Sequence, residues 1–381
     1  MASRVYIRPK LLIWACERAG FDLAHFKSHF PQLGAWVNEE KKPTLKQLER
    51  FAKATRTPVG FLFLQEPPIE NIPIPDFRIM ASKYYDRPSP DLLDTIYICQ
   101  QRQEWYREFE MFEGAERLPF VGSAKISDNI VETAARIRTE LGFELEQRRQ
   151  LSTWTEALRH FIQLADEKGV LVMVNGVVGS NNRRKLDARE FRGFSLVDAL
   201  APLVFINGTD TKAAQMFTLA HELAHIWLGE SGVSDSDVGF SPRQDIEQWC
   251  NRLAAELLVP IDALKQTYNA ATELHKEIAR LARHFKVSTL VILRRIYDIG
   301  GLDQNEYWDL YEMELERLLA IPRGKGGNFY LTLAARVSTR FARALVISTL
   351  EGRTLHRDAL GLLGFSKLAT FRELGNKVGV L

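Results

Sequence analysis

The sequence has few of the features that mark exported proteins. Its 381 residues include only three cysteines, Cys16, Cys99 and Cys250, which stand far apart and form no paired motif. Such a sparse and odd set argues against a disulfide framework and fits a reducing compartment. The first ten residues carry a few basic side chains with no apolar stretch behind them, so they do not resemble a signal peptide. The sequence therefore predicts a cytoplasmic protein.

Long apolar runs and a strong net charge are absent as well. No stretch approaches the roughly 18 apolar residues that a membrane-spanning helix needs, so we expect no membrane partner. The formal net charge is only +2, which excludes a strong attraction of polyanions to the whole molecule and leaves room for local contacts alone. The length suggests two or three domains.

The N-terminal part, residues 1–66, is predicted to be a small helical module. Helical spacing is present over residues 22–30, and a second helix is expected near residues 33–39. A third helix should begin at Thr44, because Gln47 stands three residues later and completes a capping box. Four prolines between residues 65 and 75 then predict a stiff, extended linker, which we place at residues 67–87.

The rest of the chain reads as α+β and predominantly helical. We expect a helical region at 88–168, a core with a small β-sheet at 169–264 and a helical C-terminal region at 265–381. Within the core, the patterns predict strands at 169–178, 191–197 and 202–207. They also predict a helix at 210–228 that Gly229 ends, and a loop at 232–240. A further helix should begin at Ser241, with Pro242 and Gln244 as its start signals, and end at Pro260.

The predicted helix at 210–228 carries the sequence FTLAHELAHIWLG, residues 217–229. His221 and His225 are four residues apart, so their side chains lie about 5–6 Å apart on one helical face. Both imidazoles can then reach one zinc ion at about 2.0–2.1 Å. Glu222 is placed to accept a proton from the attacking water. The pattern predicts one Zn²⁺ per chain, with Mn²⁺ or another divalent ion as the alternative.

A catalytic zinc site normally has three protein ligands and one open position. We expect Glu247 to be the third ligand, with Asp245 and Glu256 as competitors on the same predicted helix. Asn251 lies one turn after Glu247 and is placed to orient a ligand. Cys250 is interpreted as a small buried apolar residue.

The strand that precedes the predicted helix at 210–228 is expected to pair with an extended peptide substrate by strand addition. It comprises Pro202, Leu203, Val204, Phe205, Ile206 and Asn207.

The sequences FTLAHELAHIWLG at 217–229 and IEQWCNRLAAELLVP at 246–260 together resemble the ImmA/IrrE metallopeptidases. Those are gluzincin-like enzymes that cleave helix-turn-helix repressors, so the resemblance implies a zincin-like peptidase core at 169–264. His221, Glu222 and His225 match the family's H-E-x-x-H, and Glu247 and Asn251 match its later E-x-x-x-N element. Trp249 and Cys250 depart from the small and acidic residues common there. The resemblance implies a protein substrate that is a transcriptional repressor, whose cleavage derepresses stress or mobile-element genes.

Residues 5–66 and the PIPDFR sequence at 73–78 resemble the XRE-type helix-turn-helix module of longer family members. Residues 1–66 hold 11 Lys and Arg against 6 Asp and Glu, so double-stranded DNA is a possible second partner. The side chains expected at such an interface are Gln32, Asn38, Lys41, Lys42 and Lys46. A degenerate module that docks protein is the alternative, because bulky His29 and Phe30 occupy the expected turn.

A second helix-turn-helix rhythm occurs at residues 278–299, with Ser288 as a cap, and we favour packing or substrate docking there.

Two rival functions remain. One is a DNA-binding regulator or toxin–antitoxin component whose metal site is structural or sensory, and the other is a toxin that acts by broad proteolysis. Residues 327–381 offer no motif.

Overall fold

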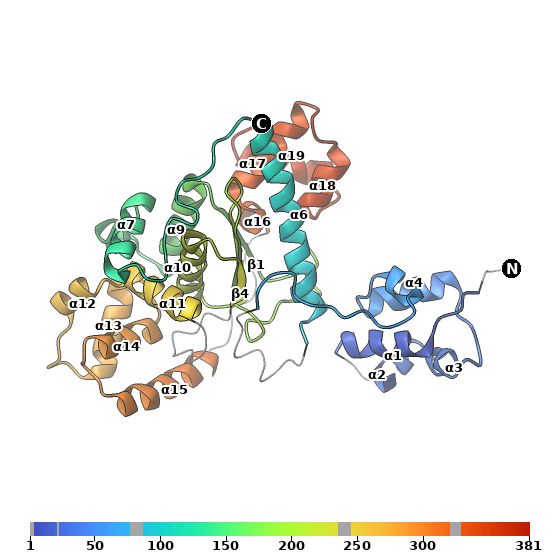
Figure 1. The fold of residues 1–381 in the computed structure, drawn as a ribbon, viewed down its shortest axis with the longest axis horizontal. Helices are drawn as coiled ribbons and strands as arrows, with labels where there is room; N and C mark the ends of the chain where they lie inside the picture. The colour runs from blue at the N-terminus through green and yellow to red at the C-terminus, as the bar shows by residue number, and fades with distance from the viewer. Residues whose placement is uncertain (1–3, 21–22, 77–86, 235–244, 321–328) are drawn as a thin grey trace. The chain divides into compact units, whose positions relative to one another are not determined.

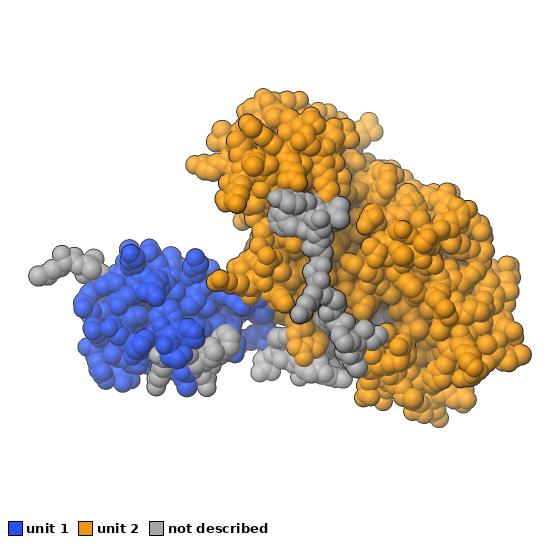
Figure 2. Space-filling model, turned by 180° about the vertical axis from the view of Figure 1, so that it is seen from behind, with its two compact units in different colours: residues 1–73, 85–96 blue, residues 74–84, 97–381 orange. Residues whose placement is uncertain are grey.

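The computed structural model describes residues 4–20, 23–76, 87–234, 245–320 and 329–381. It is α+β and predominantly helical, with one small four-stranded mixed sheet, as the sequence predicts. The chain forms two compact units (Figure 2). Unit 1 comprises residues 1–73 and 85–96, and unit 2 comprises residues 74–84 and 97–381. Among the described residues no helix is long and apolar enough to cross a membrane.

Unit 1 is a helical module around its own apolar core. Thr44 and Gln47 form the predicted capping box at the start of α4, which confirms that helix boundary. Phe51 on α4 packs edge-to-face against Trp36 and Phe30, so aromatic rings fill the centre of the module. Its elements are α1 (Pro9–Arg18), α2 (Leu23–His29), α3 (Leu33–Val37), α4 (Leu45–Ala54) and the 3-10 helix η1 (Val59–Phe63).

The sheet of unit 2 has the strand order β1-β3-β2-β4. β1 (Leu171–Asn175) runs parallel to β3 (Leu203–Asn207). β2 (Gly193–Leu196) is antiparallel to both β3 and β4 (Gly232–Ser234). Every residue of β3 is buried, because helices cover both faces of the sheet, and this explains its continuous apolar sequence. The three expected strands are confirmed, but the prediction of a loop from residue 232 is wrong for β4.

Alternate residues of the strands meet different helices. Val172, Val204 and Ile206 belong to the core that they share with α10 (Lys212–Leu228) and α9 (Trp154–Lys168). Met173 points to the other side, where Arg102 of α6 (Pro90–Phe112) contacts its sulfur at 3.6 Å. α16 (Phe329–Val337) and α17 (Thr339–Leu350) also pack on β1, and Figure 1 shows them on the side of the sheet opposite α9 and α10.

The core around α10 extends well beyond the expected limit of residue 264. The same apolar cluster includes residues up to Tyr311, because α13 (Leu274–Phe285), α14 (Thr289–Asp298) and α15 (Gln304–Ala320) contribute to it. Ser288 caps α14 as predicted. The helix-turn-helix rhythm at 278–299 thus corresponds to two real helices that are packed into the core. The remaining helices are α7 (Ile130–Leu141), α8 (Leu145–Gln150), α11 (Asp245–Leu258), α12 (Ile261–Thr267), α18 (His356–Leu363) and α19 (Leu368–Lys377).

Three arginines hold the C-terminal end of α11. Arg138 donates to the carbonyl of Glu256 at 2.7 Å, Arg295 donates to the carbonyl of Val259 at 2.9 Å, and Arg148 donates to the carbonyl of Leu258. These carbonyls have no intrahelical partner, and cations near a helix C-terminus interact favourably with the helix dipole. The three contacts therefore fix the helix that carries Glu247. The predicted start signals of this helix at Ser241, Pro242 and Gln244 lie outside the described residues.

Candidate active site

Helix α10, which carries His221, Glu222 and His225, is buried around its whole circumference. Thr211 caps its N-terminus by accepting from the amide of Ala214, and Gly229 ends it with φ +83°. The amide of Gly122 donates to the carbonyl of Ile226 at 3.1 Å, and the backbones approach so closely that a Cβ on Gly229 would lie 3.1 Å from the Gly122 Cα. His221, Glu222 and His225 are each fully buried. The polar face therefore points into the protein interior.

Electron-rich atoms of three side chains converge at one point. Nε2 of His221 lies 3.1 Å from Nε2 of His225 and 3.2 Å from Oε2 of Glu247, and Nε2 of His225 lies 3.0 Å from Oε1 of Glu247. Tetrahedral ligands at about 2.0–2.1 Å from a zinc ion would lie about 3.3 Å apart. The three side chains form the one buried His/Cys/Asp/Glu cluster with ligand spacing found among the described residues. The donor set and spacing fit a divalent metal ion.

Asn251 determines which nitrogen of His221 faces the cluster. Its Oδ1 lies 2.9 Å from Nδ1 of His221, and an amide oxygen can only accept, so Nδ1 carries the proton. In the neutral imidazole the lone pair is then on Nε2, the atom that faces Glu247 and His225. A hydrogen bond on the remote nitrogen is the usual way in which proteins orient a metal-ligating histidine.

Tertiary structure separates Glu247 from its competitors. Asp245 is exposed at the start of α11, and Glu256 forms a buried ion pair with Arg295. Only Glu247 of the three reaches the histidines. Burial opposes its ionisation, but the neighbouring His221 and His225 outweigh burial and lower the pKa of Glu247 to about 2. Cys250 is buried, and burial raises the pKa of its thiol, as expected for a small apolar residue.

Glu222 lies in a tight pocket between α10 and the sheet. The hydroxyl of Ser234 on β4 donates to its Oε1, while its buried Oε2 has no hydrogen-bond partner among the described residues. Burial raises the pKa of Glu222 to about 8, although His225 and Ser234 act in the opposite direction. Gly193 lines the same space, since a Cβ there would lie 3.0 Å from Oε1 and 2.9 Å from the carbonyl oxygen of Phe205. Neither Ser234 nor Gly193 stood out in the sequence, because no local pattern links them to Glu222.

The expected peptide-binding strand requires a correction. β3 pairs with β1 along one edge and with β2 along the other, so residues 202–207 offer no free edge for a substrate. Strand addition there would require one of these ladders to open. The outer strand on the Glu222 side of the sheet is β4.

The expected DNA-contacting residues are dispersed over unit 1. Gln32 precedes the five-residue helix α3, and its Oε1 lies 3.5 Å from Nε2 of Gln47. Asn38 ends α3 and donates to Glu40 at 3.1 Å. The three lysines are exposed; they are Lys41, Lys42 and Lys46.

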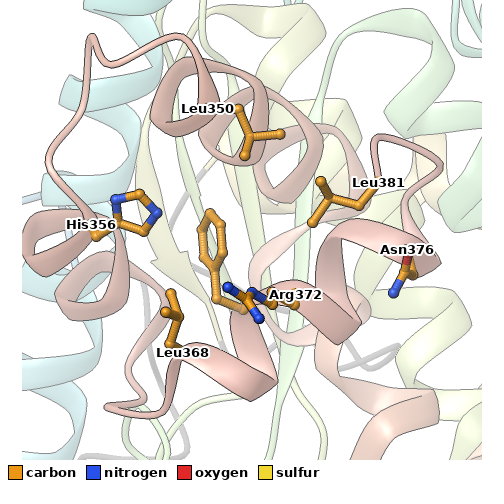
Figure 3. Close-up of a pocket in the computed structure, with 7 residues that line it drawn as sticks. Leu350, His356, Leu368, Arg372, Asn376 and Leu381 are labelled. Atoms are coloured by element: carbon orange, nitrogen blue, oxygen red, sulfur yellow. The ribbon is translucent and has the colours of Figure 1, made fainter.

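A separate cavity of about 360 Å³ lies among the C-terminal helices (Figure 3). Leu350, Leu368 and Leu381 give it an apolar lining, with His356 and Arg372 as its basic side chains. It contains none of the clustered residues His221, Glu222, His225 and Glu247, so it is not part of the candidate active site.

A buried His-His-Glu cluster on two packed helices, with a further glutamate beside a small mixed sheet, is an arrangement that suits a metallopeptidase. Comparison with known families agrees with this class: residues 165–297 match the IrrE N-terminal-like domain, peptidase family M78. The match supports a metallopeptidase-type function. Residues 337–377 match a domain of unknown function. No curated protein and no solved structure matches the chain.

Proposed function

We propose that this protein is a zinc-dependent endopeptidase. The observation that carries the proposal is the convergence of His221, His225 and Glu247 within 3.2 Å of one another, with Glu222 on the same helix. When three electron-rich groups are buried this close to one another, a cation that they share stabilises them. A purely structural zinc site usually has four protein ligands and no need of Glu222.

Each residue has a definite part in this proposal. His221, His225 and Glu247 hold the metal ion, and Asn251 orients His221. A zinc ion held there would supply Lewis-acid chemistry, since it polarises a carbonyl group and lowers the pKa of water. Glu222 accepts the proton of the attacking water and passes it to the leaving amine. Ser234 keeps the Glu222 carboxylate in position.

The substrate that we propose is a helix-turn-helix transcriptional repressor, whose cleavage derepresses the genes it controls. The family match at residues 165–297 and the resemblance of the motifs to ImmA/IrrE peptidases support this substrate class. Incubation of the purified protein with candidate helix-turn-helix repressors, followed by mass spectrometry of the fragments, tests it. Cleavage by the wild type and none by Glu222→Gln is the expected result.

Metal content is the first test of the site itself. Elemental analysis of the wild type should find about one zinc per chain, and His221→Ala should lose it. His160→Ala is the matched control, because His160 lies on α9 outside the cluster. Absence of zinc from the wild type after zinc is supplied would remove the basis of the proposal, whereas manganese in its place would change only the ion.

A second candidate function is DNA binding by unit 1. The exposed Lys41, Lys42 and Lys46 favour it, whereas α3 is only five residues long and two expected base-contacting side chains are engaged within the module. A mobility shift on double-stranded DNA upstream of the gene, with the Glu222→Gln variant, separates the two functions. A shift that disappears when the three lysines are replaced by glutamine would support DNA binding.

A further inference from the structure

The outer edge of β4 is occupied by a segment of the chain itself. Successive amides of a strand point to opposite sides, and the amide of Val233 points away from β2. It donates to the carbonyl oxygen of Pro75 at 3.0 Å. Asp76 forms a parallel bridge with the same residue. Pro75 and Asp76, which follow a bend at residues 73–74, therefore pair with this edge of the sheet through an isolated bridge.

This edge lies directly beside the proposed chemistry. Ser234, the residue after Val233, donates to the carboxylate of Glu222. Gly193, the partner of Ser234 in β2, also borders that carboxylate. The opposite outer strand, β1, is separated from β4 by β3 and β2. An extended peptide that brings a bond to Glu222 by strand addition would have to use the amide of Val233.

We propose that Ile74–Asp76 occupies the peptide-binding edge of the site in cis and must leave it before a substrate can add. The inference rests on the proposed function in one respect, namely that the substrate is a peptide. The occupant that fits is an extended segment that presents a carbonyl acceptor to Val233. A substrate competes for that donor.

The composition of Ile74–Asp76 favours a weak and reversible contact with β4. Prolines at 73 and 75 restrict both themselves and the preceding residues to extended backbone, so little entropy is lost on pairing. Pro75 has no amide hydrogen, and proline is tolerated at a sheet edge for that reason. Pro75 and Asp76 are exposed, and the described contact of the segment with β4 is short, consisting of the Val233–Pro75 hydrogen bond and the adjoining Asp76 bridge. Its occupancy depends on the high effective concentration that covalent linkage provides.

The position of the segment in the chain gives this contact a role in regulation. The first stretch of unit 1 ends at Pro73, and the chain passes from it directly into Ile74–Asp76 before it returns to unit 1 at residue 85. A partner that binds unit 1 and pulls on this connection lowers the effective concentration of the segment at β4. The edge then becomes available to a peptide in trans.

Hydrogen exchange of the Val233 amide tests the contact in the intact chain. We compare the wild type with a triple variant, Ile74→Gly, Pro75→Ser and Asp76→Gly, which removes the extended preference. The matched control is Pro67→Gly, Pro68→Ser and Ile69→Gly, three residues of the same linker that make no pairing with the sheet. The expected result is exchange at least about tenfold faster in the 74–76 variant and unchanged in the control. Equal rates in all three proteins, or an unprotected amide in the wild type, would overturn the proposal.

A peptide added in trans tests the competition. The probe is a fluorescein-labelled peptide of residues 69–76, IENIPIPD, blocked at both ends, and its binding is followed by anisotropy. It should bind the 74–76 variant at least about tenfold more tightly than the wild type or the control. Equal affinities, or no binding to the variant, would overturn the proposal.

Both readouts are independent of metal and of catalysis, so the two proposals can fail separately. If the wild type holds no zinc but the exchange and binding results are as expected, the occupied edge stands and the peptidase assignment falls. If zinc and Glu222-dependent cleavage are found while the Val233 amide exchanges equally in all variants, the reverse holds.

Discussion

The hydroxyl of Ser234 donates a hydrogen bond to the carboxylate of Glu222, and this contact joins the last residue of β4 to the centre of α10. Both side chains are fully buried. The bond ties the geometry of the proposed proton acceptor to the strand whose outer edge pairs with Pro75 and Asp76. The contact gives this three-residue strand a direct link to the proposed proton acceptor.

Ser234→Ala should lower kcat by about 10- to 100-fold with little change in KM. A hydrogen bond to a charged group contributes about 1.5–3 kcal/mol, and its loss leaves the Glu222 carboxylate free to rotate out of position. Ser234→Thr, which keeps the hydroxyl, should recover part of the rate. Steady-state cleavage of the identified substrate measures both variants, with Ser152→Ala on the surface as the control. Full activity in Ser234→Ala would show that the contact does not position Glu222.

Asn251→Leu should weaken metal binding by about 10- to 100-fold, because the proton on Nδ1 of His221 loses its acceptor. Asn251→Asp retains an acceptor and should retain most of the affinity. Competition with a zinc chelator measures the affinity without any need for substrate. Arg252→Ala, the exposed neighbour on α11, is the matched control. An unchanged affinity in Asn251→Leu would mean that His221 is oriented by packing alone.

Arg295→Leu should lower the free energy of unfolding by about 3–5 kcal/mol, because it leaves the buried carboxylate of Glu256 without its cation. The double variant Arg295→Leu with Glu256→Leu should recover a large part of that loss. Urea unfolding gives both values. Arg317→Ala breaks an exposed pair with Glu314 and should cost less than about 1 kcal/mol. Similar losses in Arg295→Leu and Arg317→Ala would contradict the importance of the buried pair.

Asp166 should make stability depend on pH. Burial raises its pKa from 3.8 to about 6, although hydrogen bonds from Ser338 and from the amides of Val172 and Thr339 lower it. The folded state therefore binds the proton more tightly than the unfolded state. The stabilisation that Asp166 gives the folded state is fully present below about pH 4 and is lost as the pH rises through 6. The loss in unfolding free energy is at most about 3 kcal/mol.

The measurement is urea unfolding of the wild type and Asp166→Asn at several pH values between 4 and 7. The difference in unfolding free energy between the two proteins should change across this range, since asparagine does not titrate. Other groups titrate equally in both proteins and cancel in the difference. A constant difference would show that Asp166 has an ordinary pKa in the folded state.

The sequence alone was sufficient for the local features of this protein. Helical spacing places His221 and His225 on one face, Gly229 ends their helix, and Thr44 with Gln47 begins α4, because these signals act between residues a few positions apart. The apolar runs at 169–178 and 202–207 also predicted strands correctly, since a strand buried on both faces is apolar throughout.

Only the tertiary structure decided the relationships between distant segments. It selected Glu247 over Asp245 and Glu256, because the rotation of α11 against α10 determines which carboxylate reaches the histidines. It placed β3 in the interior of the sheet and Val233 on its outer edge, beside Pro75. Strand order, helix rotation and edge occupancy depend on contacts between residues tens of positions apart, and no local pattern of side chains encodes them.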